Sequence, residues 1–78
     1  MKFTQYFMAM RQRADRSGIA LDWIARTINQ PEHEVVQEDG RIRRWRRIDE
    51  AGGRWLRVVL LEEGVTVHNA FFDRGGPK

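Results

Sequence analysis

The fold is set by residues 41–61, which read RIRRWRRIDEAGGRWLRVVLL. Arginine and apolar residues make up both ends of this stretch. A short segment that ends in two glycines separates the two ends. This pattern predicts two antiparallel strands, 41–48 and 54–61, joined in a hairpin by a five-residue loop. With that loop length Ile48 pairs with Arg54, and the register of the whole hairpin follows.

Strand-like alternation continues on both sides of this hairpin. Residues 33–38 predict a strand that a two-residue turn at 39–40 connects to the hairpin. Residues 65–72 predict a fourth strand, joined to the hairpin by a second turn at 63–64. Together these segments predict an antiparallel meander of four strands.

The N-terminal part of the chain shows helical spacing instead. Apolar residues from Phe3 to Ala14 recur three or four positions apart and predict a first helix, which ends at about Arg16. A second helix is expected from about Ala20 to Gln30, because a proline follows. The expected fold class is therefore α+β, with two N-terminal helices packed on a four-stranded antiparallel sheet.

These elements form one domain over residues 1–74, and a loose tail is expected at 75–78. Because side chains alternate along a strand, the register divides the sheet into two faces. The face assigned to the helices holds Ile42, Ile48, Leu56, Val58, Leu60, Val67 and Phe71. The opposite face carries Arg41, Arg43, Trp45, Arg47, Trp55, Arg57, Val59, Leu61, His68 and Phe72. A basic and apolar face of this kind usually marks an interface, unless the helices cover part of it.

The composition excludes several classes of protein. The 78 residues carry a net charge of +3, and twelve of the fourteen cationic residues are arginine. The chain has no cysteine, which excludes a disulfide or a thiolate metal site and is typical of the cytoplasm. No segment shows the pattern of a signal peptide or the roughly 20 apolar residues of a membrane span. We therefore expect a cytoplasmic protein that requires no membrane, metal or cofactor.

The densest chemical signal lies in residues 41–48, where five arginines surround one tryptophan. Guanidinium groups bind phosphates and stack on bases, and an indole ring adds a second stacking surface. The segment therefore indicates a polyanionic partner, for which RNA fits best. The expected binding residues are Arg41, Arg43, Trp45, Arg47 and Trp55 of the sheet, with Arg13 and Arg16 of the first helix. The alternative is a solvated basic strand that resists aggregation.

A catalytic set for RNA cleavage can also be assembled. Metal-independent attack by the 2′-hydroxyl needs a base, an acid and cations that neutralise the phosphorane. His68 is the candidate acid or base, because imidazole titrates near neutral pH. Arg57 and Arg74 are the candidate phosphate ligands, and Asp73 could orient one of these side chains. The alternative is an ordinary strand histidine next to a surface ion pair.

Three motifs resemble a small bacterial domain family of unknown function. They are DGRIR at 39–43, GRWLRVVLL at 53–61 and GVTVHNAFFDR at 64–74. That family is similar in fold to the BrnT and RelE/ParE toxins, which often form one half of a toxin–antitoxin pair. The resemblance implies a helix pair on a curved antiparallel sheet, a basic groove that faces RNA, and a partner protein that masks it.

The chain departs from those toxins where their catalytic residues lie. RelE-type nucleases place a tyrosine or histidine with lysine and arginine near the end of the chain, where this sequence has Phe71 and Phe72. Wider relatives often carry a histidine in the first helix, where this sequence has Tyr6, its only tyrosine. The catalytic set of the toxins therefore does not transfer as a unit.

Three hypotheses follow for the function. The first is an RNA-binding toxin-like protein, with metal-independent endoribonuclease activity on RNA such as ribosome-associated mRNA. The second is a non-catalytic module that binds RNA or a small acidic antitoxin-like protein. The third is a structural homodimer that buries the basic face.

Overall fold

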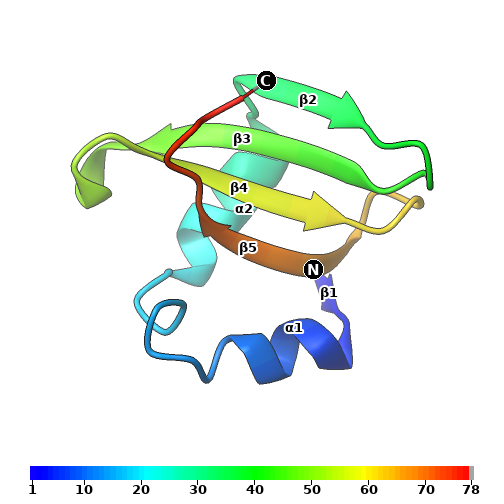
Figure 1. Ribbon diagram of the computed structural model, residues 1–78, viewed down its shortest axis with the longest axis horizontal. Helices are drawn as coiled ribbons and strands as arrows, with labels where there is room; N and C mark the ends of the chain where they lie inside the picture. Colours follow the sequence, from blue (N-terminus) through cyan, green and yellow to red (C-terminus); the bar gives the residue numbers. More distant parts are fainter. Residues whose placement is uncertain (78) are drawn as a thin grey trace.

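The computed structural model describes residues 1–77, which form an α+β domain built on one sheet (Figure 1). The sheet has five strands in the order β1-β5-β4-β3-β2, and α2 packs on β3 and β4 while α1 packs on β5. The elements are β1 Lys2–Phe3, α1 Gln5–Met10, α2 Leu21–Asn29, β2 His33–Val36, β3 Ile42–Ile48, the 3-10 turn η1 Asp49–Ala51, β4 Arg54–Leu60 and β5 Thr66–Phe72.

The central hairpin has the register that the sequence predicts. Ile48 pairs with Arg54, and the pairing continues without a break to Ile42 and Leu60. The loop of five residues closes because Gly52 adopts a positive φ of 73°, where glycine has no steric penalty. The hydrophobic alternation and the loop length were therefore sufficient to fix this part of the fold.

The pairing of β4 with β5 differs from the prediction. Leu60 pairs with Val67 as expected, but the register shifts by one residue beyond this pair, and Leu56 faces Phe72. His68 is the extra residue of a β-bulge, which changes the face of every side chain that follows it. Phe72 therefore packs against the core and Phe71 lies on the opposite face, so the predicted faces of these two rings were wrong.

The predicted sheet of four antiparallel strands is also incomplete. A fifth strand, β1, pairs in parallel with β5, with Lys2 opposite Thr66 and Phe3 opposite Val67. The sheet is therefore mixed. Two residues are too few to show a strand periodicity, and a parallel pair between the two ends of a chain leaves no local signal.

The first helix is shorter than predicted. It begins after Thr4, whose hydroxyl accepts a hydrogen bond from the backbone N–H of Phe7, and it ends at Met10 rather than near Arg16. No apolar residue other than Ala14 lies between Met10 and Ile19, so a longer helix would have no face to bury. Short helices without such packing are marginal in water. The second helix, α2, agrees with its prediction to within one residue at each end.

One hydrophobic core lies between the helices and the sheet. Its buried members are Phe7, Ile19, Ile24, Ile48, Leu56, Val58, Leu60, Val67 and Ala70. Thr27 is also fully buried, and its hydroxyl donates to the carbonyl of Trp23 at 2.9 Å, so that no polar group is left unpaired there.

Two arginines of β3 hold the end of α2. Arg44 donates to the carbonyl of Ile28 at 3.1 Å, and Arg46 donates to the carbonyl of Gln30 at 2.6 Å. Arg44 also pairs with Glu34 at 2.6 Å. The last carbonyls of a helix have no partner within it, so these side chains have a structural role.

Candidate nucleic-acid interface

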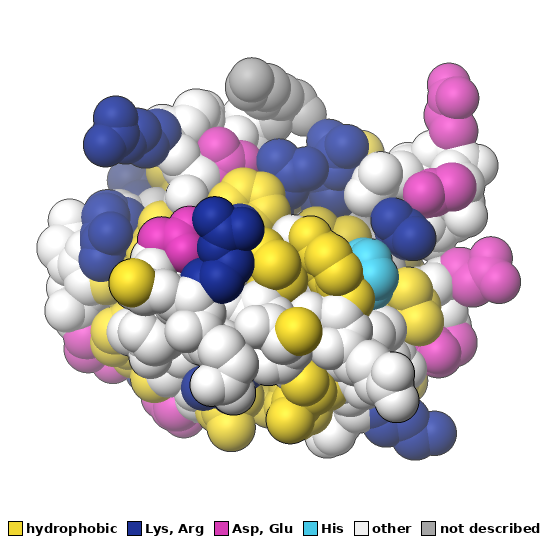
Figure 2. Space-filling model, turned by 60° about the horizontal axis from the view of Figure 1, so that its bottom comes forward, with side chains coloured by type: hydrophobic (Ala, Val, Ile, Leu, Met, Phe, Trp, Pro, Cys, Tyr) yellow, Lys and Arg dark blue, Asp and Glu magenta, His cyan; other side chains and the backbone are white. Residues whose placement is uncertain are grey.

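The sheet face opposite α2, here called the open face, combines arginine with aromatic side chains. It is the face that the chain crosses after β5 on its way toward β2 (Figure 1). Figure 2, which brings α1 to the front, shows basic side chains next to hydrophobic ones, with acidic side chains between them. On this side of the molecule, ionic and apolar groups therefore lie next to one another.

Arg57 is the centre of the open face. Its guanidinium carbon lies 5.5 Å from the ring centre of Trp45 and 5.1 Å from that of Phe71. It also pairs with Asp73 at 3.4 Å, and its Nε is buried without a partner among the described residues. One cation is thus held between two rings, at a distance where it is attracted to both.

Arg16 joins this group although it lies far away in sequence. It donates to Oδ1 of Asn69 at 2.8 Å, and its guanidinium lies 5.1 Å from the centre of the Phe71 ring. The turns that follow α1 carry it to the sheet. Arg13, expected to act beside it, is exposed and pairs with Asp15 at 3.4 Å instead. The structure therefore brings one of the two predicted arginines to the face.

A second cation–aromatic group lies at the beginning of β4. The guanidinium of Arg47 lies 4.8 Å from the ring centre of Trp55, and the edge of His33 meets the same ring at 6.0 Å. Arg47 is exposed, and its contact with Glu32 is long at 3.8 Å. Its N–H groups are therefore accessible to an anion.

Trp45 does not present a free ring. It is only 2 % exposed, and its indole N–H donates to Oδ2 of Asp73 at 3.0 Å. Burial raises the pKa of Asp73, but hydrogen bonds from Trp45, Gly75 and Arg57 outweigh this effect and hold the pKa below its usual value. The carboxylate is therefore ionised at neutral pH and locks Trp45 in place.

The segment after β5 lies across this region. Gly76 is buried, and a Cβ atom placed on it would approach the pyrrole ring of Trp55 to 3.0 Å. The predicted loose tail covers residues 75–78, of which Lys78 lies outside the described residues. Stacking of a base on the pyrrole ring of Trp55 would require this segment to move.

The predicted catalytic residues are only partly brought together. Arg57 and Asp73 are in contact, and Arg74 is the next residue. His68 lies five residues before Asp73, or about 16 Å along an extended strand. It lies within 3.1 Å of the hydroxyl of Thr4 and stacks on Tyr6.

The protonation of His68 follows from this environment. Burial, and then the charge of Arg41, lower its pKa below the usual value of 6.5. The imidazole is therefore neutral at pH 7. It is available as a base in principle, and Arg41 is close enough to act on its charge, but Arg57 and Arg74, the predicted phosphate ligands, lie toward the other end of β5.

The remaining predicted binding residues lie on the β3 side. Arg41 is exposed and makes a long contact of 3.7 Å with Asp39. Arg43 borders an open hollow of about 530 Å³ together with exposed Val35 and Val36. Its Nε is buried and has no partner among the described residues.

A deeper hollow lies at the end of the sheet where β4 begins and β5 ends. It has a volume of about 450 Å³ and is lined by Arg54, Trp55, Phe72, Asp73 and Arg74. Sequence reasoning missed Arg54 as a site residue and placed Phe72 on the other face, because the bulge at His68 has no clear signature in the sequence.

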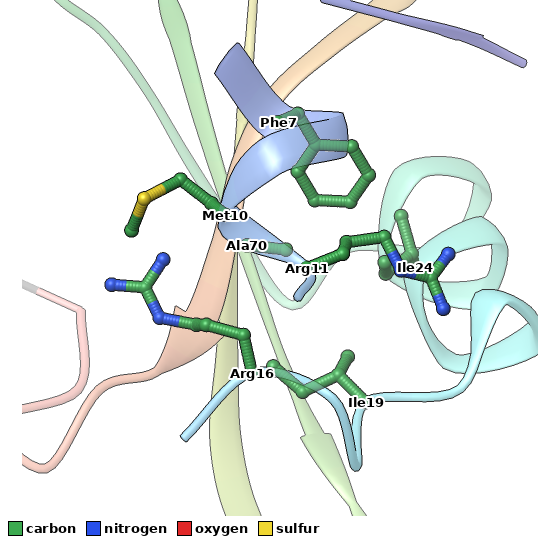
Figure 3. Close-up of a pocket in the computed structure, with 7 residues that line it drawn as sticks. All are labelled: Phe7, Met10, Arg11, Arg16, Ile19, Ile24 and Ala70. Carbon is green, nitrogen blue, oxygen red and sulfur yellow. The ribbon is translucent and has the colours of Figure 1, made fainter. Parts of the chain in front are cut away.

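The recess between α1 and α2 is a different kind of feature (Figure 3). It lies among Phe7, Met10, Ile19, Ile24 and Ala70 and leaves no room for a water molecule. The guanidinium groups that border it, from Arg11 and Arg16, point away from each other. It is part of the packed core.

No family model matches this chain, and no match is found among the curated proteins or the solved structures. Within residues 1–77 there is no cluster of three or more potential metal-ligating side chains. The helices of this same stretch all lack the length and apolar character needed to cross a membrane.

Proposed function

We propose that the protein binds single-stranded RNA on its open face, in the manner of a RelE/BrnT-like member of a toxin–antitoxin pair. The observation that supports this is the alternation of guanidinium groups and aromatic rings. Arg57 lies against Phe71 and the buried Trp45, and Arg47 lies against Trp55. Aromatic side chains stack on unpaired bases regardless of sequence, and the neighbouring arginines pair with phosphates.

The geometry favours binding over cleavage. His68 lies near Arg41 but away from Arg57 and Arg74, the predicted phosphate ligands, and Asp73 already accepts hydrogen bonds from three donors. An acid, a base and a phosphate clamp are therefore not assembled at one point, as cleavage requires. The masking partner that the resemblance implies would be a small acidic protein that covers the same arginines.

The test is the binding of a fluorescently labelled, single-stranded RNA of about 12 nucleotides, followed by anisotropy over a series of salt concentrations. Affinity should fall steeply with salt, because bound arginines release counterions. Arg47→Ala and Trp55→Ala should each weaken binding about tenfold, the scale of one lost stacking or charged contact. Arg26→Ala is the matched control. This substitution also removes one positive charge, but Arg26 pairs with Asp22 and Glu50.

Four outcomes would reject the proposal or change it. Binding that is insensitive to salt and to Trp55→Ala would remove it. An equal loss in Arg26→Ala would show an effect of net charge rather than of this face. Cleavage of the RNA in EDTA that His68→Ala abolishes would establish an endoribonuclease instead. Sedimentation of a dimer that Trp55→Ala dissociates would assign the face to a second copy.

A further inference from the structure

We infer that the hollow lined by Arg54, Trp55, Phe72, Asp73 and Arg74 is a site for one nucleotide unit, a flat base with its phosphate. The inference rests on the proposed function in that the nucleotide would belong to a bound RNA strand. The contacts that support it are a separate set. A volume of about 450 Å³ lies within the usual range for small-ligand sites and far exceeds the need of a bare phosphate.

Two arginines provide the anion-binding groups. The guanidinium of Arg54 lies 3.8 Å from the ring centre of Phe72, and its Nε donates to the carbonyl of Ala51 at 3.0 Å. These contacts fix the group, and its terminal N–H groups donate no hydrogen bond to any of residues 1–77. Neither Arg54 nor Arg74 takes part in any ion pair among residues 1–77. A phosphate is the anion whose geometry best fits a planar guanidinium.

Two aromatic residues provide the apolar part of the wall. Phe72 is held by the core and by Trp23, with ring centres 6.2 Å apart. Trp55 is held by Arg47, whose guanidinium lies 4.8 Å from its ring centre, and by Gly76, which lies against its pyrrole ring. Flat rings in a hollow of this size suit a base better than an aliphatic ligand.

Asp73 is the one acidic group in the wall, and its charge is already balanced. Oδ2 accepts from the indole of Trp45 and from Arg57, and Oδ1 accepts from the backbone N–H of Gly75. Asp73 therefore acts as a rigid part of the wall, and its repulsion of a phosphate is largely cancelled.

The experiment is a titration of the full chain with adenosine 5′-monophosphate, uridine 5′-monophosphate, adenosine and inorganic phosphate, followed by amide NMR shifts. Both nucleotides should shift the amide signals of residues 54–55 and 72–74 and bind more tightly than adenosine or phosphate. Arg74→Ala should weaken nucleotide binding about tenfold, the scale of one lost charged contact. Arg26→Ala should have no effect. Arg74 is exposed, so its loss should leave the fold intact.

A second arm separates this inference from the proposed function. The same RNA is compared with a 5′-phosphate and with a 5′-hydroxyl. Tighter binding of the 5′-phosphate form would place a strand end in the hollow. If both forms bind equally and Arg74→Ala weakens both to the same extent, an internal nucleotide occupies the hollow. RNA binding that neither Arg74→Ala nor an excess of nucleotide changes would overturn the inference and leave the proposed function intact. Nucleotide binding without RNA binding would overturn the proposed function and leave this inference intact. Phosphate that binds as well as a nucleotide would overturn the assignment of a base site.

Discussion

The indole N–H of Trp45 donates to Oδ2 of Asp73 at 3.0 Å and so ties the middle of β3 to the turn that follows β5. This bond spans 28 positions of sequence and crosses β4 on the open face. Together with the guanidinium of Arg57, which lies 5.5 Å from the ring centre, it holds a tryptophan that is only 2 % exposed. The stability of the sheet and the position of the last residues are therefore coupled.

Replacing Asp73 should uncouple them. Asp73→Ala leaves a buried indole N–H without an acceptor and should lower the free energy of unfolding by about 1–3 kcal/mol. Asp73→Asn retains an acceptor but loses the charge that pairs with Arg57, so it should cost less. Urea unfolding followed by tryptophan fluorescence measures both. Equal stability of Asp73→Ala and the unmodified chain would show that the bond contributes nothing.

Stability should fall in acid through carboxylates whose pKa is lowered by folding. The hydrogen bond from Arg26 lowers the pKa of Glu50 to about 2, and the backbone N–H of Thr66 lowers that of Glu63. A carboxylate with a lower pKa in the folded state binds fewer protons there than in the unfolded chain. Its stabilisation is therefore complete above its unfolded pKa near 4.5 and is lost as pH falls through its folded pKa.

The measurement is the urea midpoint between pH 7 and pH 2. Glu50→Gln should make the acid limb of this curve shallower. Glu62→Gln is the control, because Glu62 makes no ion pair or side-chain hydrogen bond within the part of the chain that the structure describes. The same slope in both variants would contradict the assignment to Glu50.

Phe71 and Phe72 should respond differently to the same change. Phe72 packs against the core, so Phe72→Ala should cost about 2 kcal/mol or more of unfolding free energy. Phe71 lies between Arg16 and Arg57 on the open face, so Phe71→Ala should cost about 1 kcal/mol and should weaken RNA binding. Chemical unfolding and RNA anisotropy on both variants check this. The opposite order of stabilities would contradict the bulge at His68.

Arg44 should matter for stability, whereas Arg47 on the same strand should not. Arg44→Ala removes both the Glu34 pair and the donor to the last turn of α2, which should cost about 1–2 kcal/mol. Arg47 is exposed, and surface ion pairs contribute little. Thermal unfolding distinguishes them. Arg47→Ala should instead reduce RNA affinity, so the two variants separate structure from binding.

Gly76 should not accept a side chain. Its φ of 66° is unfavourable for other residues, and a Cβ atom would lie 3.0 Å from Trp55. Gly76→Ala should therefore push the last residues away from the sheet and increase quenching of tryptophan fluorescence by acrylamide. Gly18→Ala is the control, because nothing lies within 4 Å of that position. Unchanged quenching in both variants would contradict the packing of Gly76 on Trp55.

The amino-acid pattern alone predicted the central hairpin and the side chains along it that face the helices. Alternation of apolar and polar residues is a local signal, and a loop of five residues left one register that gave both strands an apolar face. The same reasoning correctly placed Trp45 opposite Arg57 and Arg47 opposite Trp55. It also located α2, because a proline ends its apolar spacing.

The aromatic rings that line the candidate site could not be identified without the folded structure. The bulge at His68 exchanges the faces of Phe71 and Phe72, and nothing in the local periodicity marks it. The contact of Arg16 with Phe71 and the bond from Trp45 to Asp73 join residues that are distant in sequence. Such contacts depend on how the chain returns to the sheet, which is set by packing of the whole domain and not by the pattern of any one segment.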